Sequence, residues 1–66
     1  MMNPIDSIME FFAYEHLTEH LQAVSRPCGE LAKEMAENLP MDPETTAGLR
    51  KLLEAKDCFV RAKLRK

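Results

Sequence analysis

Apolar residues recur every three or four positions along most of the 66-residue chain, which is the spacing of an α-helix. The longest stripe runs through the middle of the chain and predicts a helix over residues 18–38. Its members are Leu17, Leu21, Val24, Cys28, Leu31, Met35 and Leu39. Shorter stripes predict helices over residues 4–12 and 43–64. The strict alternation typical of a half-buried strand is not found in the sequence, so we expect helices alone.

Prolines mark where these helices begin. Asn3-Pro4 and Asp42-Pro43 each place a capping side chain before a proline at the first helical position, where the missing N–H costs nothing. Pro27 lies inside the middle helix, where it removes one backbone hydrogen bond and predicts a kink. The connection near residues 39–42 is short, which favours two antiparallel long helices. The predicted fold is therefore all-α: a short N-terminal helix followed by an antiparallel helical hairpin, in a single domain over residues 1–66.

The chain is short for a self-sufficient core. A domain of this size draws only about 3–5 kcal/mol from its core, and two cysteines can add at most one disulfide. We therefore expect self-association to bury more surface. No apolar run approaches the roughly 20 residues of a membrane span, and the N-terminus lacks the pattern of a secretory signal. We interpret the chain as cytoplasmic, with Cys28 and Cys58 as reduced thiols that fill space in or beside the core.

The net charge of −2 hides an uneven distribution. Residues 1–49 hold two basic and nine acidic side chains and carry −7, whereas residues 50–66 hold seven basic and two acidic side chains and carry +5. This asymmetry indicates either two elements that attract each other or an anion-binding surface on the last helix. The acidic body opposes DNA, so we do not expect DNA among the partners. The lack of a long apolar run likewise predicts no membrane partner.

The segment His16-Leu-Thr-Glu19-His20 has the spacing of the inverted zinc-protease motif. Catalytic zinc needs a distal third protein ligand and a scaffold large enough for a peptide cleft, and neither is evident in 66 residues. Neither cysteine has a neighbouring histidine that would activate its thiol, and two glycines cannot form a Gly-rich phosphate loop. We therefore expect that the chain is not an enzyme and that it uses no metal and no cofactor.

Basic residues on the last helix are candidate ligands for an anion. Lys56 falls on the apolar stripe, so its ammonium group must reach solvent, pair with an acid or face an anion. Arg61 and Arg65 follow near the same side. The row of three is either a solvated edge or, if symmetry brings copies together, a phosphate clamp.

Three of the four aromatic residues lie between the first two predicted helices. Phe11 and Phe12 fit a hydrophobic plug that closes the end of the hairpin. Tyr14 has polar neighbours, and its amphipathic ring can stack on a base while its hydroxyl forms a hydrogen bond. Tyr14 is therefore either part of the plug or a contact to a ligand or subunit.

An ordered set of motifs spans residues 11–65. It consists of Phe12-x-Tyr14-x-His16-Leu17, the long helix from Val24 to Leu39, the turn with Pro40 and Glu44, and Leu49-Arg-Lys-Leu-Leu-Glu-Ala-Lys56-Asp-Cys-x-Val60-Arg61-Ala62. This set resembles the small helical-hairpin domain of phage sponge proteins. Those anti-CBASS proteins sequester cyclic oligonucleotide signals of that antiviral system, and a related hairpin occurs in phage inhibitors of the Thoeris system.

The resemblance implies a compact homohexamer in which pairs of protomers enclose cyclic dinucleotides and separate three-fold pockets take cyclic trinucleotides. It also implies that Tyr14 stacks on a base, that Arg26 holds a phosphate, and that Arg61 or Arg65 lines the other pocket. Copies of Tyr14, Arg26 and Lys56 brought together by a two-fold axis would supply rings and cations to a symmetric ligand. We expect a phage sponge that binds its signal without hydrolysis in the cytoplasm of an infected bacterial cell. The alternative is a ligand-free helical module that oligomerises or docks on a host protein.

Overall fold

The computed structural model describes residues 3–65. Its elements are helix α1 (Pro4–Met9), the single 3₁₀ turn η1 (Glu10–Phe12), helix α2 (Glu19–Asn38) and helix α3 (Pro43–Leu64). Within this range the regular structure is helical throughout, which confirms the all-α prediction. A loop over residues 13–18 joins η1 to α2, and a turn over residues 39–42 joins α2 to α3.

Side-chain caps fix where α1 and α3 begin. The Asn3 side-chain oxygen accepts a hydrogen bond of 2.8 Å from the Asp6 backbone N–H, and Asp42 accepts one of the same length from the Glu44 N–H. Each satisfies a donor that a helix start leaves without a partner. Helix α2 continues through Pro27 as far as Asn38, and the kink near Pro27 stays a prediction.

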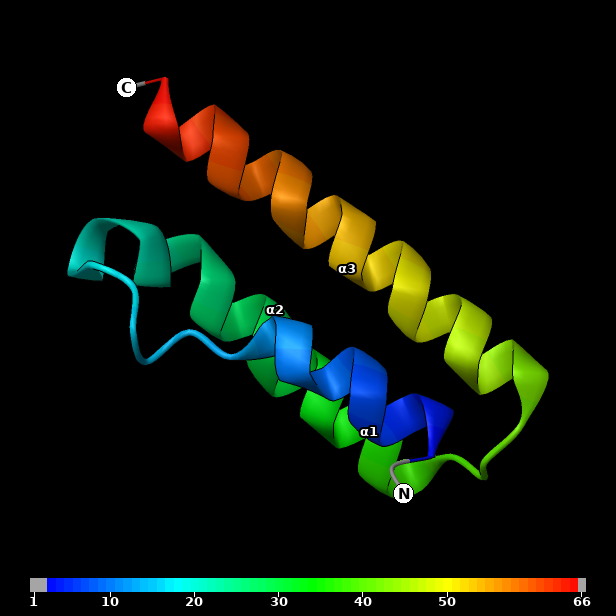
Figure 1. Ribbon diagram of the computed structural model, residues 1–66. Helices are drawn as coiled ribbons and strands as arrows, with labels where there is room; N and C mark the ends of the chain where they lie inside the picture. Colours follow the sequence, from blue (N-terminus) through cyan, green and yellow to red (C-terminus); the bar gives the residue numbers. More distant parts are fainter. Residues whose placement is uncertain (1–2, 66) are drawn as a thin grey trace.

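The two long helices lie side by side, and the N-terminal segment covers one side of the pair (Figure 1). After the turn at residues 39–42, α3 returns alongside α2, while α1 and η1 contact the pair near its middle and its turn end. The core forms where these elements meet, from Ile5, Ile8, Phe12, Ala32 and Leu49. Three of its five side chains come from α1 and η1, so the short N-terminal segment is a structural part of the domain.

The buried face of α2 differs from the predicted leucine stripe. Its buried residues are Ser25, Cys28, Gly29 and Ala32, whereas Leu31 is 45 % exposed and Leu39 is also exposed. The buried side of α2 therefore includes small residues in place of Leu31 and Leu39. The N-terminal segment packs closely against this side of α2, where leucine side chains would not fit. Of the two residues predicted to plug the end of the hairpin, Phe12 is buried in the core at 3 % exposure, whereas Phe11 is 65 % exposed, so the prediction is wrong for Phe11. Adjacent residues of a 3₁₀ turn point to different sides, so only one ring enters the core.

None of the helices in residues 3–65 combines the length and the apolar character that crossing a bilayer requires.

Candidate functional site

The loop that carries Tyr14 is fastened to the beginning of α2. The Leu17 N–H donates to the Tyr14 carbonyl at 3.0 Å, which closes a turn within the loop. The Gln22 side-chain amide donates to the Leu17 carbonyl at 2.7 Å, from the first turns of α2. Tyr14 is thereby held at a defined place, although its loop has no regular secondary structure.

Gly29 lets the loop and the Tyr14 ring approach the α2 backbone. A Cβ atom at Gly29 would lie 3.0 Å from the Phe12 carbonyl oxygen and 3.0 Å from Tyr14 Cδ2. These separations are below an ordinary van der Waals contact, so a side chain here would push against both neighbours. Because Gly29 has no side chain, the half-buried Tyr14 ring can lie against the backbone of α2.

Arg26 places a cation over the Tyr14 ring. Its guanidinium carbon lies 5.5 Å from the ring centroid, within the range of a cation–π interaction. Arg26 is exposed and stands one turn before Gly29 on α2. The structure thus brings together two of the residues that the resemblance singled out, an aromatic ring and a cation that can also face an anion.

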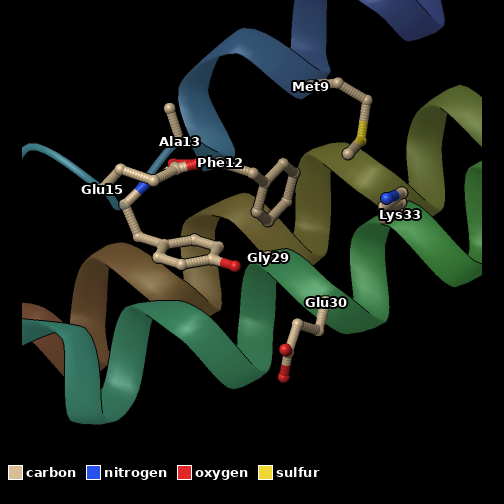
Figure 2. A pocket seen from close by; sticks show the side chains of 8 residues that line it. Met9, Phe12, Ala13, Glu15, Gly29, Glu30 and Lys33 are labelled. Atoms are coloured by element: carbon tan, nitrogen blue, oxygen red, sulfur yellow. Dashed lines mark hydrogen bonds between the residues drawn. The ribbon is translucent and has the colours of Figure 1, made fainter.

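An open cavity of about 390 Å³ lies beside Tyr14 (Figure 2). Its lining comes from α1, η1, the loop and α2: Met9, Phe12, Ala13, Tyr14, Glu15, Gly29, Glu30 and Lys33. Lys33 is a cation that the sequence reasoning missed. A usable signal was present, because Lys33 follows Arg26 by seven residues and so lies on the same side of the helix.

A second hollow lies beside Arg26. It has a volume of about 370 Å³ and is lined by Glu19, Gln22, Ala23, Arg26 and Pro27. Since Pro27 has no N–H, it cannot donate to the Ala23 carbonyl, as a residue four positions later normally does. Arg26 therefore also lines a hollow to which Tyr14 does not contribute, near the Ala23 carbonyl that Pro27 cannot donate to.

Lys56 is engaged within the fold. Its Nζ donates to the Phe11 carbonyl at 3.0 Å and pairs with the Asp57 carboxylate at 3.2 Å, and its side chain is only 13 % exposed. Lys56 thus binds the end of η1 to α3. The sequence left three possibilities for Lys56: to reach solvent, to pair with an acid or to face an anion. In the structure Lys56 pairs with the acid Asp57 and also donates to a backbone carbonyl. One of its three N–H groups stays available for a ligand.

Arg61 shares a third cavity with Lys56. This cavity has a volume of about 370 Å³ and lies between the loop and α3, with His16 also in its lining. The Arg61 Nη2 donates to the Cys58 sulfur at 3.3 Å. Arg65 is the exposed C-cap residue of α3, one turn further along. The five predicted residues therefore fall into a Tyr14–Arg26 pair, a Lys56–Arg61 pair and the separate Arg65.

The contacts of His20, Cys28 and Cys58 lie within the fold. His20 Nε2 lies 3.2 Å from the Lys63 carbonyl and links the start of α2 to the end of α3. Within residues 3–65 no three His, Cys, Asp or Glu side chains gather into a group that could hold a metal ion. Cys28 is buried and Cys58 exposed, and both are free thiols. Burial raises the pKa of the Cys28 thiol, and the Lys56 ammonium offsets part of that rise.

The chemistry that these residues offer is stacking, cation–π contact and anion binding. Tyr14 supplies a ring, and Arg26 and Lys33 supply cations on one side of α2, with Glu15 and Glu30 as acceptors at the cavity. Comparison of the chain with protein-family models, with curated proteins and with solved structures finds no match.

Proposed function

We propose that this protein is a sponge that binds and sequesters cyclic di- or trinucleotide immune signals without hydrolysing them, and so inhibits antiviral signalling in the host. The observation that carries the proposal is the placement of the Arg26 guanidinium over the ring of Tyr14, a residue that lines an open cavity. A cyclic dinucleotide presents two base faces and two phosphates, so it needs aromatic surface and cations. The resemblance of residues 11–65 to phage sponge domains points to the same ligand class.

The proposed binding step exchanges one partner of Arg26 for another. In the free protein the guanidinium covers the ring, where an exposed cation–π contact contributes about 0.5–1 kcal/mol. A charge-assisted bond to phosphate is stronger, so a ligand can draw Arg26 off the ring and stack a base in its place. Stacking of one base on an aromatic side chain contributes about 1–3 kcal/mol.

A single chain offers one Tyr14 ring to a ligand that has two bases. We therefore propose that α2 and α3 act as a helical hairpin that assembles into a homo-oligomer, in keeping with the hexamer that the resemblance implies. The Lys56–Arg61 cavity and Arg65 are the corresponding candidates for the separate trinucleotide pocket. On this proposal the protein acts in the cytoplasm of an infected bacterium, lowers the free signal by stoichiometric capture, and requires no catalytic group.

Isothermal titration with a panel of cyclic di- and trinucleotides tests the proposal. We expect tight binding of at least one, with the intact compound recovered by mass spectrometry after heat denaturation. Tyr14→Ala and Arg26→Ala should each weaken binding about tenfold or more, whereas Tyr14→Phe keeps the stacking surface and stays close to wild type. Arg50→Ala, at an exposed arginine of α3, is the matched control. Absence of binding across the panel would refute the proposal.

The exposed apolar side chains favour a second candidate, a ligand-free module that oligomerises or docks on a host protein. Phe11, Met41 and Leu64 are each more than half exposed. If the second candidate holds, Tyr14→Ala and Arg26→Ala will disturb assembly or partner capture while nucleotide affinity stays undetectable. Native mass spectrometry of the variants, run beside the titrations, separates the two candidates.

A further inference from the structure

A partly exposed apolar stripe follows α3 on a side of the helix pair whose two cavities contain no residue of α1 or η1. On α3 the stripe steps by four, three, four and three residues through Gly48, Leu52, Ala55, Phe59 and Ala62. Phe59 is 52 % exposed. Two shallow cavities of the described surface lie along the stripe, and residues of α2 and α3 line both. The α1–η1 side, by contrast, holds the cavity beside Tyr14.

The two cavities have rims of opposite charge. The one near the end of α3 has a volume of about 280 Å³ and is lined by Val24, Phe59, Ala62 and Lys63. The one near the turn has a volume of about 190 Å³ and includes Leu39, Gly48 and Leu52, with Glu44 at its rim. A basic rim therefore lies beside Phe59 and an acidic rim beside Gly48.

No contact among residues 3–65 requires a glycine at position 48. A glycine inside a helix costs about 0.5–1 kcal/mol relative to alanine. A Cβ atom built on Gly48 would meet nothing within 4 Å, so no neighbouring element requires the small residue. The open space at Gly48 adjoins the apolar cavity near the turn and is bounded by Leu52 on the next turn of α3. This is the form of a hole that takes a bulky side chain from another helix.

We propose that this stripe binds a second copy of the chain, with the two α3 helices antiparallel about a two-fold axis that passes between Leu53 and Glu54. In this register Phe59 of one copy enters the hole at Gly48 of the other. The same register sets Lys63 against Glu44 of the second copy and Leu52 against its Ala55. An isologous interface uses each pair twice, so Phe59 and the two rim charges, Lys63 and Glu44, each meet a complementary group in a single arrangement.

The charges select this direction over a parallel one. A parallel pairing would set Glu44 on Glu44 and Lys63 on Lys63, and like charges in contact disfavour an interface. The uneven charge along the chain has the same effect, because residues 1–49 carry −7 and residues 50–66 carry +5. The pairing does not rest on nucleotide binding, since neither Tyr14 nor Arg26 lines the two cavities on the stripe.

Sedimentation equilibrium of the full chain without nucleotide tests the pairing. We expect the wild type to self-associate and Gly48→Leu to raise the dissociation constant about tenfold or more, because the new side chain fills the hole meant for Phe59. Circular dichroism should show that Gly48→Leu keeps its helix, since leucine is the better helix former. Phe59→Ala should weaken association to a similar extent. Phe11→Ala, at an exposed phenylalanine outside the stripe, is the control and should leave association unchanged.

A charge exchange tests the register itself. Glu44→Lys and Lys63→Glu should each weaken association, and the double variant should recover most of the wild-type affinity because the opposed charges are merely swapped. A wild-type chain that stays monomeric at every concentration would overturn the proposal. So would a Gly48→Leu chain that associates as tightly as wild type, or a double variant weaker than both single ones.

Discussion

Substitution of the two glycines gives a matched test of how the Tyr14 loop is held. Both lie inside long helices, and alanine at either should gain about 0.5–1 kcal/mol of helix propensity. At Gly48 the new Cβ meets nothing within 4 Å, so the gain should appear in full. At Gly29 the Cβ meets the Phe12 carbonyl and the Tyr14 ring, both at 3.0 Å. Overpacking of this kind costs about 1–3 kcal/mol, which cancels or exceeds the propensity gain, so we expect a net change between about 0 and 2.5 kcal/mol of destabilisation.

The Gly29 contact is hard to relieve because one of its two partners is main chain. The Phe12 carbonyl belongs to a residue whose side chain is in the core, so the oxygen cannot move without the core moving. The assay is urea denaturation followed by circular dichroism, with both variants made in a Phe59→Ala background so that self-association does not contribute. A domain of this size shifts its Tm by about 4–8 °C per kcal/mol, so thermal melts resolve the difference. Equal stabilisation by Gly29→Ala and Gly48→Ala would refute the close packing of the loop on α2.

Four further predictions concern the core and the thiols. Lys56→Met removes the donor to the Phe11 carbonyl and should lower the free energy of unfolding by about 1–2 kcal/mol in urea, with exposed Arg50→Met within about 0.5 kcal/mol of wild type. Ser25→Ala should raise it by about 1 kcal/mol, because the Ser25 hydroxyl is buried and has no hydrogen-bond partner among residues 3–65; an unchanged midpoint would contradict this. In native protein Cys58 should react with a thiol reagent at least about tenfold faster than Cys28, as peptide mapping would show, and comparable rates would mean that Cys28 is accessible. Burial raises the pKa of the Cys28 thiol, so the folded state binds the thiol proton more tightly than the unfolded state does. The thiol's contribution to the free energy of unfolding is therefore complete below the pKa of the unfolded state and is lost as the pH rises through the pKa of the folded state. Cys28→Ala should remove this loss of stability at alkaline pH.

The sequence was sufficient to locate the helices because their ends depend on local chemistry. Asn3 and Asp42 each cap a helix through a hydrogen bond to a residue two or three positions later, and the following proline fits the first helical position. Such signals do not require knowledge of the rest of the fold. The middle helix begins at Glu19 after Thr18, whose side chain forms no capping bond, and there the apolar spacing was the usable evidence.

The spacing of apolar residues could not predict which side of α2 is buried, because that side is set by the elements that pack against the helix. The stripe of large residues predicted Leu31 as core, yet Gly29 and Ala32 face inward and Leu31 is exposed. Because the N-terminal segment approaches α2 closely, only small residues fit on the side of α2 that it contacts. A hydrophobicity pattern instead predicts that the larger apolar side chains are buried. The partners of Lys56 were hidden for the same reason: the Phe11 carbonyl is 45 residues away in sequence, and every backbone has carbonyls.

The positions of the two surfaces decide what kind of assembly the proposed function needs. In the proposed α3 pairing the copies meet through the stripe from Gly48 to Ala62, whereas Tyr14 and its cavity lie on the α1–η1 side. That pairing alone therefore leaves the two Tyr14 rings on separate outer surfaces, where one cyclic dinucleotide cannot reach both. A ligand that stacks on two rings must create or use a second interface. A chain with two different two-fold interfaces builds a larger closed assembly than a dimer, as a hexamer of the kind implied by the resemblance requires. In a Phe59→Ala chain that no longer pairs through α3, added cyclic dinucleotide should still join two chains through their Tyr14 sides, at one ligand per two chains.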